Sequence, residues 1–273
     1  MNQSEGSTMN DIDKKLVVIR NDNRVGIMAH LVAGYPSMKK TESIAKTMAN
    51  AGVDFLELQM PFSDPIADGP AIMNACSRSL AGGTKITEFM KSIKSISKNV
   101  SVPLIIMAYY NNVFKYGVDV FCSDAKYFGA SGLIVPDMPI DEEQSEHFMG
   151  NAKKHGLYTI RVISPVSTHE RLKKNAKGAE GFVYCTSRQG ITGVHKELNN
   201  NIEGYLKRVR KEFKIPLAVG FGISRKEHVR TLAGHADVVV IGSAILNIIN
   251  KHPRNEEKNV GRFIKSISGI KVH

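Results

Sequence analysis

The sequence predicts a single-domain (β/α)8 barrel, and three observations support this prediction. The length of 273 residues suits such a barrel, which typically needs about 250 residues. Apolar, β-branched runs alternate with amphipathic stretches along the chain, which favours parallel βα units. No single linker interrupts the alternation, so closure into one barrel is the simplest arrangement, and an open doubly wound sheet is the alternative.

The predicted elements follow from this alternation in chain order. Apolar runs predict eight strands, at residues 27–32, 55–58, 104–108, 132–135, 158–163, 182–185, 217–219 and 238–241. Amphipathic stretches between them predict helices at residues 38–51, 86–95, 142–155, 168–176, 202–213 and 226–232. The long connection between the second and third strands holds an acidic loop and a further helix, and the last strand leads directly into an apolar helix.

The two ends of the chain differ in character. Residues 1–10 are polar and are expected to form a disordered N-terminal extension, whereas residues 11–273 are expected to form the single barrel domain. Residues 1–15 contain no apolar signal-peptide core, and no apolar run approaches the roughly 20 residues of a membrane span. We therefore expect a cytoplasmic protein without a membrane partner.

The net charge of +11 indicates an anionic partner. The densest basic stretches, residues 91–98, 171–177 and 207–214, fall in predicted helices, so solvated helix faces are the simpler explanation. A nucleic-acid motif and tryptophan are both absent from the sequence, and we expect no nucleic-acid partner. A phosphorylated small molecule is the anion that this charge would help to steer.

Cysteine and histidine spacing argues against metal and disulfide chemistry. Cys76, Cys122 and Cys185 are odd in number and widely separated, which is typical of reduced thiols. The nine histidines show no HExxH motif and no paired short spacing. The sequence therefore predicts no metal site.

The segment at residues 57–70 carries the most informative chemistry. Glu57 follows an apolar run near the end of a predicted strand, and the three prolines that follow form a stiff loop with Asp64 and Asp68. A buried carboxylate costs several kcal/mol unless it is paired or protonated, so Glu57 is a candidate for proton transfer. Asp64 precedes a proline, and a turn-forming role alone would explain it.

Two glycine-bearing strand ends come late in the chain. Residues 219–224 read Val-Gly-Phe-Gly-Ile-Ser, and residues 240–245 read Val-Ile-Gly-Ser-Ala-Ile. Glycines at such ends let backbone N–H groups approach an anion, and the start of a helix adds its dipole. After the seventh and eighth strands of a barrel this is a common phosphate site, although tight turns alone would also require glycine.

Other residues at strand ends suggest a ligand and a lid. Tyr109, Tyr110 and Asn111 follow the third strand, and Tyr184 lies on the sixth; packing at the barrel edge would explain these tyrosines, and an aromatic, partly polar ligand would also suit them. The polar, glycine-containing residues 187–195 follow the sixth strand and have the character of a mobile lid.

These motifs together resemble the tryptophan synthase alpha chain family. Residues 57–70 match the pattern Glu-Leu-x-x-Pro-Phe-Ser-Asp-Pro-x-Ala-Asp-Gly-Pro, which is highly specific. Residues 187–193, 220–224 and 242–245 add Ser-Arg-x-Gly-x-Thr-Gly, Gly-Phe-Gly-Ile-Ser and Gly-Ser-Ala-Ile. The resemblance runs in order from about residue 26 to residue 249.

The resemblance implies a barrel enzyme and a partner. The implied activity is a lyase reaction, the retro-aldol cleavage of indole-3-glycerol phosphate to indole and glyceraldehyde 3-phosphate. The implied partner is the beta chain of tryptophan synthase, in an α2β2 heterotetramer. No cofactor is implied in this chain, while pyridoxal phosphate (PLP) is expected in the beta chain. Three alternatives stay open: a different sugar-phosphate enzyme, a non-catalytic subunit that activates the beta chain, and a nucleic-acid-binding protein.

The resemblance also assigns roles by position. Glu57 is implied as the catalytic acid–base, and Asp68 as the catalytic carboxylate at the indole N–H. The other implied site residues are, for substrate binding, Tyr184, Tyr109, Phe221, Ile72 and Thr192; for phosphate binding, Gly193, Gly222, Gly242 and Ser243; and for the partner interface, Pro61, Asp64, Pro65 and Asn111. Two residues depart from the family pattern: Gln59 stands where many members have glycine, and His30 stands where an aromatic substrate contact is frequent.

Overall fold

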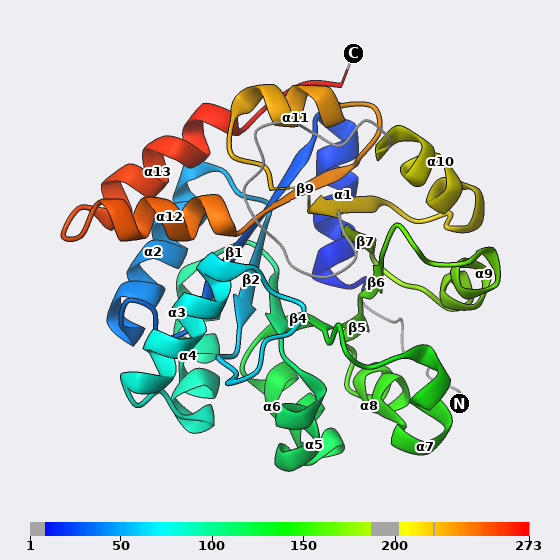
Figure 1. Cartoon of the computed structure of the whole chain (residues 1–273), viewed down its shortest axis with the longest axis horizontal. Helices are drawn as coiled ribbons and strands as arrows, with labels where there is room; N and C mark the ends of the chain where they lie inside the picture. Colours follow the sequence, from blue (N-terminus) through cyan, green and yellow to red (C-terminus); the bar gives the residue numbers. More distant parts are fainter. Residues whose placement is uncertain (1–8, 187–201, 221, 273) are drawn as a thin grey trace, which may run out of the picture.

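Nine parallel strands form one continuous sheet in the part of the chain that the computed structural model describes, residues 9–186, 202–220 and 222–272 (Figure 1). Their spatial order is β5-β4-β3-β2-β1-β9-β8-β7-β6. The strands are β1 Gly26–Val32, β2 Phe55–Gln59, β3 Leu104–Met107, β4 Ala130–Ile134, β5 Tyr158–Thr159, β6 Arg161–Ile163, β7 Val183–Thr186, β8 Leu217–Gly220 and β9 Val238–Ile241.

The barrel closes through a single interrupted strand. β5 pairs with β4, and β6 pairs with β7, while only Ile160 separates β5 from β6 along the chain. The backbone N–H of Ile160 donates to the carbonyl of Leu133 on β4, so the interruption is local. The run at residues 158–163 therefore serves as one strand that completes an eight-stranded ring. The predicted (β/α)8 barrel is confirmed, and the open sheet is not found.

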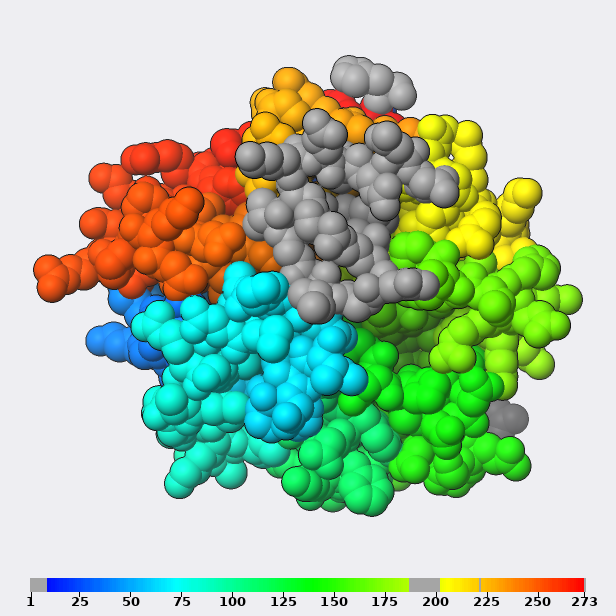
Figure 2. All heavy atoms as spheres, viewed as in Figure 1, coloured from blue at the N-terminus to red at the C-terminus, as the bar shows by residue number. Residues whose placement is uncertain are grey.

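Helices surround the ring of strands in sequence order. In Figure 2 the colours run in order around this face of the molecule, as expected for successive βα units. The helices are α1 Asp11–Asn21, α2 Met38–Ala51, α3 Pro70–Ala81, α4 Ile86–Asn99, α5 Tyr110–Tyr116, α6 Val118–Tyr127, the 3-10 helix η1 Ile140–Glu142, α7 Glu143–Glu146, α8 Phe148–Lys154, α9 His169–Ala176, α10 Ile202–Glu212, α11 Lys226–Leu232, α12 Ser243–Lys251 and α13 Glu256–Ile267.

The strand residues alternate between two apolar layers. Leu56 and Leu58 of β2 belong to the outer layer, which packs against the helices. Phe55 belongs to the barrel interior, with Met28, Ile105 and other inward-facing side chains. Because a strand alternates its faces with period two, Glu57 and Gln59 continue the inward face above Phe55. The strand register therefore decides that these two polar residues point into the barrel.

Helix α1 closes one end of the barrel, below the inward-facing layer that contains Phe55. Its apolar residues Ile12, Leu16 and Ile19 are buried in the interior cluster rather than in the outer layer. The Asn10 side chain caps the helix by accepting a hydrogen bond from the backbone N–H of Ile12. Residues 1–8 of the expected N-terminal extension lie outside the described residues, so the predicted boundary at residue 10 stays a prediction.

Several elements differ from those expected from the sequence. Strand limits agree within two residues, apart from the interruption at Ile160. The single helix predicted at residues 142–155 is wrong: η1, α7 and α8 replace it, because His147 adopts a left-handed conformation with φ of 52°. Helices α1, α5, α6 and α13 were not predicted. Among the described residues, no helix is both long enough and apolar enough to cross a membrane.

Candidate active site

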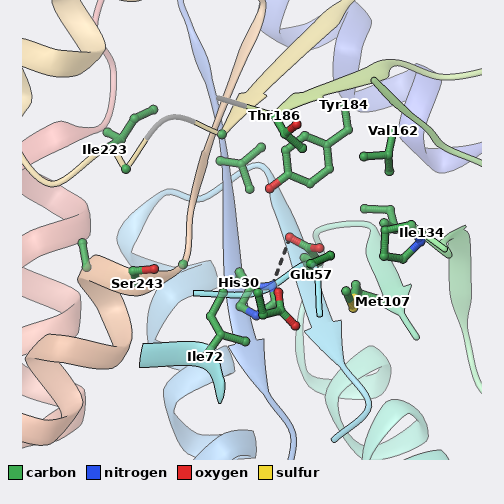
Figure 3. Close-up of a pocket in the computed structure, with 18 residues that line it drawn as sticks. His30, Glu57, Ile72, Met107, Ile134, Val162, Tyr184, Thr186, Ile223 and Ser243 are labelled. Atoms are coloured by element: carbon green, nitrogen blue, oxygen red, sulfur yellow. Dashed lines mark ion pairs between the residues drawn. The ribbon is translucent and has the colours of Figure 1, made fainter. Parts of the chain in front are cut away.

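A cavity opens at the C-terminal ends of the strands, where barrel enzymes bind their substrates. Figure 3 shows its walls, which mix two buried carboxylates with apolar and glycine residues. The lining residues are His30, Glu57, Ala67, Asp68, Ile72, Met107, Ile134, Pro136, Val162, Tyr184, Thr186, Gly220, Gly222, Ile223, Val240, Gly242, Ser243 and Ala244.

Glu57 reaches this cavity from the inward face of β2. Its side chain is 3% exposed, so the carboxylate is removed from bulk water. Its Oε2 lies 3.2 Å from Nδ1 of His30 on β1, the residue directly opposite in the strand register (Figure 3). Since a buried carboxylate without a partner is costly, this ion pair with His30 explains how the chain tolerates Glu57 in the cavity.

Asp68 enters the same cavity from the loop that follows β2. Its Oδ2 accepts hydrogen bonds from Gln59 Nε2 at 2.7 Å and from the Tyr109 hydroxyl at 2.9 Å. Burial raises the pKa of Asp68, while the positive charge of His30 and the two hydrogen bonds oppose this rise. The net pKa is above the ordinary value of an aspartate, so Asp68 holds its charge at an electrostatic cost.

Tyr109 supports Asp68 from behind and does not line the cavity. Its hydroxyl accepts a hydrogen bond from the backbone N–H of Ala67 and donates to Asp68. Its ring stacks on Phe62 with centroids 5.0 Å apart. The tyrosine hydroxyl thus holds the loop through Ala67 and Asp68, and its predicted role in substrate binding stays a prediction.

Tyr184 faces the carboxylates from β7, across the cavity (Figure 3). Burial, followed by the negative charges of Glu57 and Asp68, raises the pKa of Tyr184 well above its ordinary value, so its hydroxyl stays protonated. Gly220 on the neighbouring strand β8 makes room for this ring, because a Cβ at that position would lie 2.7 Å from the tyrosine hydroxyl oxygen. Predicted Tyr184 and Ile72 both line the cavity.

The edge of the cavity beyond Tyr184 is built from glycines and a helix start. Gly242 is the N-cap of α12 and Ser243 its first residue, so free backbone N–H groups point out of the helix at this place. Gly222 has a φ of 64°, a conformation that favours glycine. The three predicted phosphate residues that are described, Gly222, Gly242 and Ser243, therefore share one wall, and the N-terminus of α12 suits an anion.

Part of the predicted site lies outside the described residues. This applies to Thr192 and Gly193, to Phe221, and to the lid predicted at residues 187–195. Their predicted roles stay predictions.

The predicted interface residues divide into two pairs. Asp64 and Asn111 are exposed, whereas Pro61 and Pro65 are buried within the chain itself. Directly after Pro65 the loop exposes Ile66, whose surface is 76% accessible. Single exposed apolar side chains are normal at protein surfaces, so Ile66 matters here through its position next to the predicted interface residues and to the cavity-lining Ala67.

The sequence reasoning missed the apolar wall of the cavity. Met107, Ile134 and Val162 come from β3, β4 and β6 and face Glu57 (Figure 3). Their inward position follows from strand register, which a short apolar run does not reveal by itself. An apolar wall opposite two carboxylates suits an aromatic ring that carries one polar edge.

Three buried polar atoms in or beside the cavity have no hydrogen-bond partner among the described residues. They are His30 Nε2, Glu57 Oε2 and Gln59 Oε1. The contact between His30 and Glu57 is close enough for an ion pair but lacks hydrogen-bond geometry. Because buried polar atoms are normally satisfied, this cluster is prepared to bind a polar group of a ligand.

Comparisons with known proteins agree with this geometry. A model of the family described as tryptophan synthase alpha chain matches residues 16–272. The tryptophan synthase alpha chain of Desulfotalea psychrophila is 40% identical over 94% of this chain and 99% of its own length. The chain belongs to the tryptophan synthase alpha chain family.

Further relatives support the same assignment. The alpha chain of a Thermoanaerobacter species is 37% identical over 96% of this chain and all of its own length. A chain of Mycobacterium tuberculosis tryptophan synthase superposes with a TM-score of 0.89 at 28% identity, covering 97% of this chain and 100% of that one. Tryptophan synthase subunit alpha of Legionella pneumophila superposes with a TM-score of 0.86 at 30% identity, covering 95% and 97%.

Family membership establishes the function. The chain is a lyase of tryptophan biosynthesis that cleaves indole-3-glycerol phosphate to indole and glyceraldehyde 3-phosphate. The family also implies a beta-chain partner. Among the described residues, no group of three or more histidine, cysteine or acidic side chains is arranged to hold a metal ion. The three cysteines are buried and unpaired.

Proposed function

We propose that Glu57 and Asp68 have separate roles in this cleavage: Glu57 acts at C3 of the indole and Asp68 at the ring nitrogen. The observation that carries the proposal is that two buried carboxylates line one cavity opposite an apolar wall. Glu57 is the acid–base group, and Asp68 is the carboxylate that holds the indole N–H. Gln59 and Tyr109 both bond to Oδ2 of Asp68, which leaves Oδ1 for the substrate.

The reaction then needs one proton to move from the substrate hydroxyl to the indole ring by way of Glu57. The Glu57 carboxylate accepts the proton of the hydroxyl on the carbon next to C3 and delivers this proton to C3. The cation that forms on the ring is stabilised by Asp68 at the ring nitrogen. The carbon–carbon bond breaks, its electron pair returns to the ring, and neutral indole and the aldehyde leave. The proton count balances, and no cofactor in this chain takes part.

The remaining residues bind and orient the substrate. Ile72, Met107 and Ile134 pack against the ring, and the Tyr184 hydroxyl acts as a donor beside Glu57. Gly222, Gly242 and Ser243 receive the phosphate at the start of α12, and the resemblance to the family adds Gly193, Thr192 and Phe221 to the substrate-binding residues. Binding at the phosphate holds the reacting carbon in place, which lowers the barrier through orientation.

The same proposal covers the partner and the compartment. The loop at residues 60–74 and helix α5 meet the beta chain, with Asp64 and Asn111 at the interface, and Pro61 and Pro65 stiffen the loop. The assembly is an α2β2 heterotetramer in the cytoplasm, with PLP held by the beta chain. The isolated chain is expected to have a low turnover. The beta chain raises this turnover in the complex by ordering the loops around the site.

The test is indole release from indole-3-glycerol phosphate by wild type and Glu57→Gln, with and without the beta chain. We expect the variant to lose about 10²- to 10⁴-fold in kcat, because general acid–base catalysis contributes this much. Binding of a phosphate-ester substrate analogue and the far-ultraviolet circular dichroism spectrum should stay unchanged. Glu170→Gln, an exposed acid on α9, is the matched control and should keep full activity.

Two outcomes would contradict the proposal. Wild-type turnover in Glu57→Gln would remove Glu57 from the chemistry. Stimulation of the beta chain by a wild-type chain that itself releases no indole, alone or in the complex, would instead indicate a regulatory subunit, and the phosphate wall would then bind an effector.

A further inference from the structure

His30 and Gln59, the two residues that depart from the family pattern, contact the two carboxylates of the site. His30 Nδ1 lies 3.2 Å from Glu57 Oε2, and Gln59 Nε2 donates to Asp68 Oδ2 over 2.7 Å. All four side chains are at least nine-tenths buried. They form one polar cluster on the inward faces of β1 and β2 and in the loop that follows β2.

The backbone is built to hold an imidazole at position 30. His30 pairs directly with Glu57 in the register of β1 and β2, so both side chains point to the same face at the same height. On the other side, a Cβ at Gly242 would lie 3.3 to 3.4 Å from three carbon atoms of His30. The glycine at the end of β9 therefore leaves just the space that the histidine ring fills.

The charges around His30 are negative. Glu57 faces it from β2 and Asp68 from the following loop, while β9 and α12 present only the uncharged Gly242 and Ser243. No lysine or arginine lines the described part of the cavity. Burial alone would lower the pKa of His30, but the Glu57 carboxylate, with a smaller effect from Asp68, raises it above the ordinary histidine value. His30 therefore holds its proton more tightly than an ordinary histidine does.

We propose that His30 is a positioning residue of the cleavage reaction, a buried cation that keeps Glu57 and Asp68 ionised together in the free enzyme. The inference rests on the roles proposed above for the two carboxylates. Without a cation, two carboxylates in one apolar cavity repel each other, and one of them takes up a proton. Glu57 would then enter the reaction in the wrong protonation state, or Asp68 would no longer attract the ring nitrogen.

Gln59 completes this arrangement by orienting Asp68. Its amide nitrogen is committed to Asp68, and its Oε1 has no hydrogen-bond partner among the described residues. The His30 Nε2 atom has none either, so a modest side-chain movement or one water molecule would join the two. The result is a polar chain that connects Glu57, His30, Gln59 and Asp68. The proton of His30 stays on the imidazole throughout the reaction, and Glu57 alone exchanges protons with the substrate.

The test is the pH dependence of kcat/KM for indole release by the full chain and its His30 variants. In wild type we expect activity to fall on the alkaline side as His30 loses its proton, at a pH above about 6.5. His30→Phe keeps an aromatic ring without charge, and His30→Asn keeps a polar group that does not titrate. Both should lose the alkaline fall, and their acid limb should move up by about one pH unit, because a nearby cation lowers carboxylate pKa values.

A second readout does not depend on activity. Nuclear magnetic resonance of histidine-labelled protein follows the titration of the His30 ring, assigned by its disappearance in His30→Asn. The ring should titrate above the ordinary histidine pKa, and Glu57→Gln should bring that value down. His252→Asn, an exposed histidine at the end of α12, is the matched control and should change neither the pH profile nor the His30 titration.

The outcomes separate this inference from the proposed function. If Glu57→Gln is inactive but the His30 variants keep the wild-type pH profile and differ only in KM, His30 merely fills space and the inference is wrong, while the function stands. The inference is equally overturned if His30 titrates at or below the ordinary histidine value. Wild-type activity in Glu57→Gln would instead remove the proposed role of Glu57 itself.

Discussion

At the scale of single residues, the two carboxylates in the cavity have different surroundings. Glu57 has the imidazole of His30 beside it, whereas Asp68 accepts two hydrogen bonds from neutral donors. Burial raises the pKa of Asp68, and the net pKa stays raised despite His30, Gln59 and Tyr109. The charge on Asp68 is therefore maintained at the expense of stability, as is common where function requires a buried charge.

The substitution Asp68→Asn tests the cost of this buried charge. Both hydrogen bonds to this side chain end on Oδ2, and the amide oxygen of asparagine can accept them. A raised pKa in the folded state gives a contribution to stability that is present at low pH and is lost as the pH rises through that pKa. Removal of the charge should therefore raise the melting temperature at pH 7, while kcat falls about 10²- to 10³-fold with the loss of electrostatic stabilisation.

The measurement is thermal unfolding at pH 7 and at pH 4, together with indole release. The stability gain of Asp68→Asn should shrink at pH 4, because the raised pKa of wild-type Asp68 lets it take up a proton more readily as the pH falls. The control for stability is Asp64→Asn, which changes an exposed aspartate. Asp237→Asn is unsuitable, because Asp237 accepts a hydrogen bond from the backbone N–H of Leu217 and forms an ion pair with Arg210. A loss of stability at pH 7 would show that the hydrogen bonds outweigh the cost of the charge.

At the scale of elements, α1 and α12 lie at the two ends of the barrel interior and differ in function. Helix α1 inserts Ile12 between strands, where Gly132 and Gly181 leave room: an added Cβ would lie 2.9 Å and 3.2 Å from the isoleucine side chain. Helix α12 leaves its N-terminus open to the cavity. One end is therefore packed for stability and the other is left polar for binding, as is general in barrel enzymes.

Ile12→Ala tests this division. The side chain is fully buried, so its truncation should lower the free energy of unfolding by about 2–5 kcal/mol through lost burial and a residual cavity. The KM for indole-3-glycerol phosphate should not change, because the substitution lies at the end of the barrel remote from the site. Val18→Ala, on the exposed face of the same helix, should change stability by less than about 0.5 kcal/mol. A raised KM in Ile12→Ala would show that the two ends are coupled.

At the scale of the whole molecule, the face that carries the cavity also carries an exposed apolar side chain, Ile66. Ile66 follows Pro65 and precedes Ala67 and Asp68, so a partner that covers Ile66 also constrains the loop that carries Asp68. This placement gives a partner on this face a direct physical route to the cavity. The net charge of +11 acts at the same scale, since it attracts a phosphorylated substrate from a distance without contributing to the fold.

Ile66→Asp should weaken the complex with the beta chain, because it buries a charge in the contact. We expect at least a tenfold rise in the dissociation constant, and a smaller rise in indole release on addition of the beta chain. The activity of the isolated chain should change little. Val18→Asp introduces the same charge at an exposed position on α1, at the opposite end of the barrel, and should leave the affinity unchanged. Equal binding by both variants would exclude this loop from the interface.

The sequence by itself determined the fold class, most strand positions and the two carboxylates. Strands of parallel barrels are buried on both faces, so they appear as continuous apolar runs that can be located without a structure. The acidic loop is defined by its prolines and acids over fourteen consecutive residues, 57–70, so its signal is local. Elements without such local signals were missed, namely α1, α5, α6 and α13, and the break at His147 was not foreseen.

Only the tertiary structure decided how these residues meet. That His30 faces Glu57 depends on the register between β1 and β2, and that Tyr109 supports Asp68 depends on the path of the loop across β3. Register and loop path are set by contacts between residues tens of positions apart, which sequence periodicity does not encode. For this reason the sequence identified Glu57 and Asp68 one at a time, while the cluster that joins them through His30 and Gln59 emerged from the folded chain.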